Sequence, residues 1–112
     1  MADRWHIQTA EGMFLLARHW PPRFDIAGEA VFPEMRADRL ARQIRQDMWR
    51  RLQHIRGFSP VVEIRTCAEG LRVRAGGRAA IGGTALEREA LTIVDLLNSP
   101  SCRRRWARWA RL

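Results

Sequence analysis

The chain has 112 residues, of which 46% are hydrophobic and 29% charged, a composition typical of one globular domain and not of a disordered segment. All twenty basic residues are arginine, and against twelve acidic residues they give a formal net charge of +8. A GC-rich genome explains arginine in place of lysine but not this surplus, which implies a polyanion or an acidic partner. The apolar run at residues 13–17 is too short to span a membrane, and we expect a cytoplasmic protein.

The N-terminal part, residues 1–32, shows no clear period. Pro21 and Pro22 end any regular element before them, because proline has no backbone N–H to donate. We expect Phe24 and Phe32 to lie in extended chain and to pack their aromatic rings on the core. We predict an irregular segment here.

The clearest element is a long helix over residues 33–56. Its apolar residues recur at three- and four-residue spacing and form one stripe: Ala37, Leu40, Ala41, Ile44, Met48, Leu52 and Ile55. Pro33 suits a first turn and Gly57 a C-terminal stop. Two acid–arginine pairs are expected four residues apart, Asp38 with Arg42 and Asp47 with Arg51.

An antiparallel meander is predicted over residues 60–82. Residues 61–66 and 71–75 alternate apolar and polar side chains, and Gly70 supplies the turn between them. Gly76 and Gly77 are interpreted as a second turn, which leads to a short third strand at residues 78–81.

Two helices are predicted over residues 84–112. Thr84 and Glu87 have the spacing of a capping box, and Ser99 followed by Pro100 predicts a second helix start. The expected fold is therefore a single α+β domain over residues 1–112. In it, a small antiparallel meander of two or three strands packs against the long central helix and two C-terminal helices.

The outer face of the hairpin is the first candidate site, because alternation places Arg65, Arg72 and Arg74 there. Arg65 lies opposite Arg72 in one register and opposite Arg74 in the other. Opposed like charges destabilise a sheet unless an anion such as phosphate, or an acid such as Glu63, lies between them. A solvated edge hairpin explains the charges equally well.

The arginine-rich C-terminal segment is the second candidate. Arg103, Arg104 and Arg108 alternate with Trp106 and Trp109, a mixture that can bind backbone phosphates and stack on unpaired bases. The more common alternative is that the tryptophans cap the core while the arginines stay in water, and we expect this for at least one tryptophan.

The leading hypothesis is a small non-enzymatic DNA- or RNA-binding protein that contacts phosphates through these six arginines with little sequence readout. The alternative is an adaptor or accessory subunit that binds an acidic protein surface. Its contacts would be Trp106 and Trp109 together with Arg39, Arg42 and Arg50 on the long helix. Homo-oligomerisation stays open.

Catalysis and metal binding have little support in the sequence. His6, His19 and His54 are scattered without metal-binding spacing, and no nucleophile motif occurs. Cys67 and Cys102 are isolated, so we expect free thiols. We predict no catalytic residue, metal or cofactor.

Overall fold

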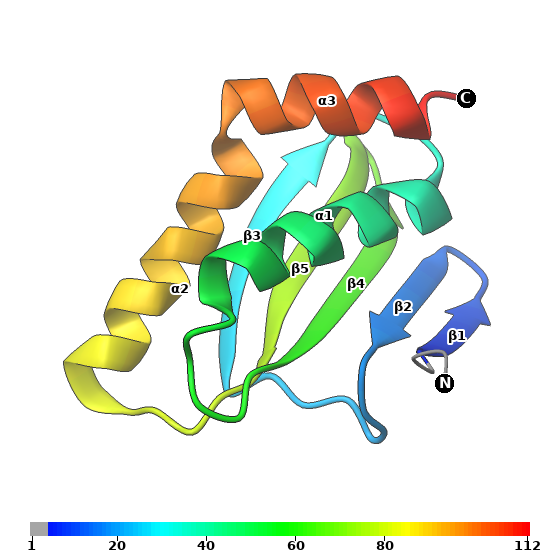
Figure 1. The fold of residues 1–112 in the computed structure, drawn as a ribbon. Coiled ribbons are helices and arrows are strands. Elements are labelled where there is room, and N and C mark those ends of the chain that lie inside the picture. The colour runs from blue at the N-terminus through cyan, green and yellow to red at the C-terminus, as the bar shows by residue number, and fades with distance from the viewer. Residues whose placement is uncertain (1–4) are drawn as a thin grey trace.

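The computed structural model describes residues 5–112, which form five strands and three helices (Figure 1). In chain order these are β1 His6–Ala10, β2 Met13–Ala17, β3 Ile26–Phe32, α1 Ala37–Leu52, β4 Ser59–Cys67, β5 Gly70–Arg78, α2 Gly83–Asn98 and α3 Pro100–Ala110. The strands make one antiparallel sheet in the order β1-β2-β4-β5-β3. The α+β class is as predicted, but the sheet is larger than a meander of two or three strands.

The prediction of an irregular segment over residues 1–32 is wrong for its described part, which contributes β1, β2 and β3. β2 is buried on both faces, so its sequence is a continuous apolar run without alternation. β1 is exposed along its whole length and carries no hydrophobic pattern at all. Residues 1–4 lie outside the described residues.

The hairpin of β4 and β5 is confirmed, but the third strand predicted at residues 78–81 is wrong. Gly76 and Gly77 do not form a turn and lie inside β5. A Cβ atom on Gly76 would collide with the carbonyl oxygen of Ile26, and one on Gly77 would collide with that of Ser59. Glycine is therefore needed where β5 passes closely between its two neighbours, and β3 takes the place of the third strand.

The helices follow the predicted pattern with different boundaries. α1 spans Ala37–Leu52 and is therefore shorter than the helix predicted over residues 33–56. No side chain caps its N-terminus. The capping box is wrong, because α2 starts after Gly82 with no side-chain cap. The Ser99 cap is confirmed, since its side chain accepts a hydrogen bond from the backbone N–H of Cys102 at the start of α3.

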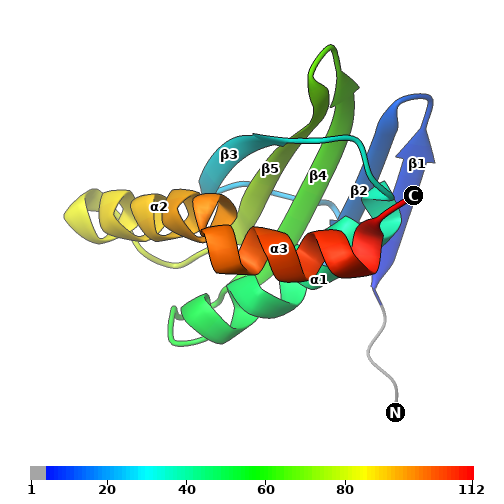
Figure 2. The same ribbon diagram turned by 90° about the horizontal axis from the view of Figure 1, so that it is seen from above.

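All three helices of residues 5–112 lie on one face of the sheet, and none of them covers the other face (Figure 2). The main core lies between the two layers, where the apolar stripe of α1 meets the inward side chains of the strands. A smaller cluster on the open face contains Leu15, Ala17 and Val61, with Phe24 packed against it. None of the helices in residues 5–112 is long and apolar enough to cross a membrane.

Candidate functional site

The hairpin arginines lie on the open face of the sheet, as the alternation predicts. Of the two possible registers the structure has the one that sets Arg65 opposite Arg72. Arg74 lies opposite Glu63 on one side and Glu29 on the other, and its guanidinium stacks 4.2 Å from the ring centre of Phe24. Three arginines thus share this face with two glutamates, which leaves only a small local excess of positive charge.

Arg103 is held by the protein itself. Its guanidinium donates hydrogen bonds to the carbonyl oxygens of Leu97 at 2.8 Å and Val31 at 3.0 Å, and it lies 3.9 Å from the ring centre of Phe32. Burial lowers the pKa of this guanidinium. Arg103 therefore connects α3 to the end of α2 and to the outer edge of β3, and its donors face backbone oxygens.

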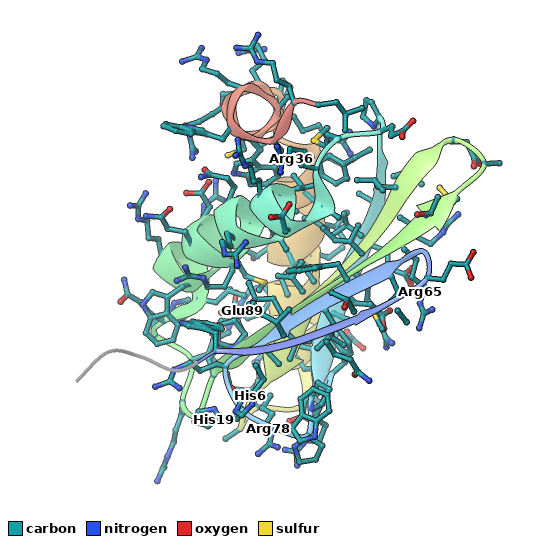
Figure 3. The ribbon with its side chains drawn as sticks, turned by 90° about the vertical axis from the view of Figure 1, so that its right-hand side faces the viewer. His6, His19, Arg36, Arg65, Arg78 and Glu89 are labelled. Carbon is teal, nitrogen blue, oxygen red and sulfur yellow. The ribbon has the colours of Figure 1, made fainter. Side chains whose placement is uncertain are left out.

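The six arginines proposed from the sequence do not form one surface. Arg65 extends from the side of the sheet that faces away from the helices, whereas α3 lies in the helical layer (Figure 3). Arg104 and Arg108 are exposed on α3. The tail and the hairpin are therefore two separate groups on opposite sides of the sheet.

The net charge of the chain is concentrated in α1, α3 and the residues that flank them. Residues 36–56 contain seven arginines and two aspartates, and residues 100–112 contain five arginines and no acid. These two segments together carry +10, while the rest of the chain carries −2. The nucleic-acid hypothesis from the sequence did not include the α1 arginines. The adaptor alternative combined Arg39, Arg42 and Arg50 with the tryptophans of α3 but not with its arginines, so this concentration was not predicted.

α1 and α3 pack side by side, so their exposed arginines lie on neighbouring helices. The backbone N–H of Arg36 donates to the carbonyl oxygen of Ala110 at 2.6 Å, at the start of α1 and the end of α3. Asp47 of α1 accepts hydrogen bonds from Arg105 at 2.8 Å and from the indole N–H of Trp106 at 2.6 Å. The predicted pair of Asp47 with Arg51 is thus replaced by contacts to α3 and to Arg50.

We call this surface the α1–α3 basic face. Its members are exposed side chains of both helices: Arg39, Arg42, Arg50, Arg104, Arg108 and Trp109. Arg42 lies 3.6 Å from Asp38, the predicted pair, and Arg50 lies 3.5 Å from Asp47. Within residues 5–112, the guanidinium groups of Arg39, Arg104 and Arg108 have no acidic partner, which leaves them available to an external anion.

The two tryptophans of α3 have different environments. Trp106 is fully buried in the core, as expected for at least one of them, so it cannot serve as an interface residue. Trp109 is 59% exposed. It follows Arg105 by one helical turn and so lies on the side of α3 that faces α1.

Two polar pairs outside this face involve histidine. Nδ1 of His19 lies 2.7 Å from Oγ of Ser59, and Nε2 of His54 lies 2.6 Å from a carboxylate oxygen of the buried Glu89. Among residues 5–112, no group of three metal-ligating side chains comes together, and Cys67 and Cys102 are free thiols.

Comparison with known proteins found no matching family model, no matching curated protein and no matching solved structure.

Proposed function

We propose that this protein binds nucleic acid through the α1–α3 basic face, mainly by phosphate contacts and with little reading of base sequence. The observation that carries the proposal is the +10 charge of residues 36–56 and 100–112, which contain α1 and α3, against −2 in the rest of the chain. A surface of one charge sign attracts a polyanion and orients it on approach. Arginine suits phosphate because its planar guanidinium donates two parallel hydrogen bonds.

The proposal predicts a steep dependence on salt. Each arginine that neutralises a phosphate of duplex DNA releases a counterion and adds about −0.9 to the slope of log affinity against log salt. Five arginines in contact would give a slope of about −4.5, equivalent to a loss of roughly 500-fold between 50 and 200 mM salt. The hairpin, where Glu63 and Glu29 flank Arg74, would contribute little to this slope.

Two matched variants test the proposal by fluorescence anisotropy with labelled duplex DNA, single-stranded DNA and RNA. The triple change Arg39→Gln, Arg104→Gln and Arg108→Gln removes three charges from the basic face. We expect it to make the slope on duplex DNA shallower by about 2.7.

The control is the triple change Arg65→Gln, Arg72→Gln and Arg74→Gln, which removes the same formal charge from the hairpin. We expect it to change the slope by less than about 1. Equal losses in both variants would mean that only total charge matters, and a larger loss in the hairpin variant would assign binding to the sheet.

The second candidate function is docking on an acidic protein, and the exposure of Trp109 favours it. Tryptophan and arginine are common anchors of protein interfaces, and Trp109 is 59% exposed beside the arginines of this face. Polyglutamate in the same titration separates the two functions. Tighter binding of polyglutamate than of any nucleic acid at physiological salt would favour the acidic protein.

A further inference from the structure

A hollow of about 270 Å³ lies beside α1 on the side away from α3. Trp49 lines this hollow. Asp47, two residues earlier in α1, faces α3. Two residues of a helix differ in direction by about 200°, so the side chain of Trp49 points away from α3. The hollow is lined by Trp5, Arg18, His19, Arg45, Trp49, Phe58 and Pro60. Figure 3 shows His19 at the end of the molecule opposite Arg36 and α3. We call this hollow the Trp49 pocket.

The wall of the Trp49 pocket is aromatic and its polar groups are basic. The rings of Trp49 and Phe58 stack with an angle of 13° between their planes, and Trp49 is still 41% exposed. The guanidinium groups of Arg45 and Arg18 lie 4.6 and 5.8 Å from the ring centre of Trp5. No acidic residue is among the lining residues of the described chain.

His19 adds an oriented polar group to this wall. Its Nδ1 is held 2.7 Å from Oγ of the buried Ser59, which fixes the ring. Nε2 of His19 has no hydrogen-bond partner within residues 5–112 and stays available to a ligand. Aromatic faces beside guanidinium and imidazole groups suit a flat ring that carries a phosphate.

We propose that the Trp49 pocket takes one unpaired base of a nucleic-acid strand whose backbone lies on α1. This inference rests on the proposed function and adds a preference for single strands to it. Arg42 of the basic face precedes Trp49 by two helical turns, which is about 10 Å along the axis. A strand held by its phosphates on α1 therefore passes the mouth of the pocket.

The size of the pocket limits what enters. Pockets for drug-sized ligands have volumes of about 300–1,000 Å³, and this one is just below that range. One base fits this limit better than a longer ligand. In a duplex the base faces are covered by stacking, so the pocket acts only on single strands or unpaired positions.

The test compares the affinities of the full chain for a single-stranded oligonucleotide and for a duplex of the same length by anisotropy. Trp49→Ala removes the stacking surface, and we expect its single-strand affinity to fall roughly 5- to 150-fold, the range found when one stacking aromatic is lost. Its duplex affinity should stay within about twofold. Trp49→Phe keeps an aromatic face and should restore most of the single-strand affinity.

Trp20→Ala is the matched control. Trp20 is 48% exposed, its ring centre lies 6.0 Å from that of His6, and it does not line the pocket. We expect this variant to bind single strands like the wild type.

The outcomes separate the two proposals. If Trp49→Ala binds single strands like the wild type, or loses affinity for single strands and duplex equally, the base pocket is refuted while the backbone contacts stand. If the wild type binds neither form, the proposed function itself fails and the pocket inference fails with it.

Discussion

Asp47→Ala is the most informative single change, because Asp47 holds α3 against α1 and so builds the basic face. The side chain of Asp47 is 9% exposed, and its carboxylate accepts the indole N–H of Trp106 at 2.6 Å. Trp106 is fully buried, and its indole N–H loses its acceptor when the carboxylate is removed. We expect a large loss of stability from a change of a few atoms.

The structure sets the size of the effect. An unsatisfied buried donor costs about 1–3 kcal/mol, and a hydrogen bond to a charged group is worth about 1.5–3 kcal/mol. The ion pair with Arg105 adds little, because the Arg105 side chain is 45% exposed and water screens it. We therefore expect Asp47→Ala to lower the free energy of unfolding by about 2–4 kcal/mol. Asp47→Asn keeps an oxygen acceptor for the indole and should cost about half as much.

Urea denaturation followed by tryptophan fluorescence measures these differences. Asp95→Ala is the control, because Asp95 is exposed on α2 and should change stability by less than about 0.5 kcal/mol. An Asp47→Ala protein within about 0.5 kcal/mol of the wild type would refute the reasoning, since the buried indole would then not depend on this carboxylate.

Three further changes test other parts of the structure. Gly76→Ala should cost about 2–4 kcal/mol in urea denaturation because its Cβ would meet the β3 backbone. Gly82→Ala, with nothing within 4 Å, should cost less than about 1 kcal/mol, which reflects only the poorer N-cap that alanine makes for α2. Arg103→Gln should lower the free energy of unfolding by about 1–3 kcal/mol but leave the nucleic-acid affinity of the folded protein unchanged. The pKa of Asp25 is lowered by the hydrogen bond from Arg23 and by the backbone N–H of Ala79. With this lowered pKa, the ionised carboxylate stabilises the fold at any pH above the pKa of Asp in the unfolded chain, which is about 3.9. Asp25→Asn should therefore be destabilising at neutral pH. Its cost in denaturation curves should shrink as the pH falls below about 4. A cost that does not change with pH would contradict this origin.

Sequence periodicity predicted the elements that bury one face. The α1 stripe and the β4–β5 alternation are confirmed because each side chain there meets either the core or water. β1 and β2 escaped prediction for opposite reasons, since one is exposed throughout and the other is buried on both faces. The glycine pair at 76 and 77 was wrongly predicted to form a turn for a third reason. A turn and a close approach between strands both require glycine, and the sequence does not distinguish them.

The candidate site was only partly predictable. From the sequence, Arg104 and Arg108 belonged to the nucleic-acid candidate, and Trp109 was combined with Arg39, Arg42 and Arg50 in the adaptor alternative. Nothing in the sequence joined Arg104 and Arg108 to the α1 arginines, because helix packing depends on long-range contacts. Asp47 lies beside the apolar stripe, next to Met48, and that position was the available signal that it faces the core. The role of Arg103 was not predicted, since it depends on the backbone oxygen of Val31, a residue distant in the sequence.

The most direct test of the nucleic-acid proposal is a map of backbone amide and arginine side-chain NMR shifts of the full chain on titration with a short DNA duplex. The proposal predicts that saturable shifts gather at residues 37–52 and 100–111 and are strongest for Arg39, Arg104 and Arg108. Shifts centred on residues 65–74, or no saturable shifts at moderate salt, would contradict it.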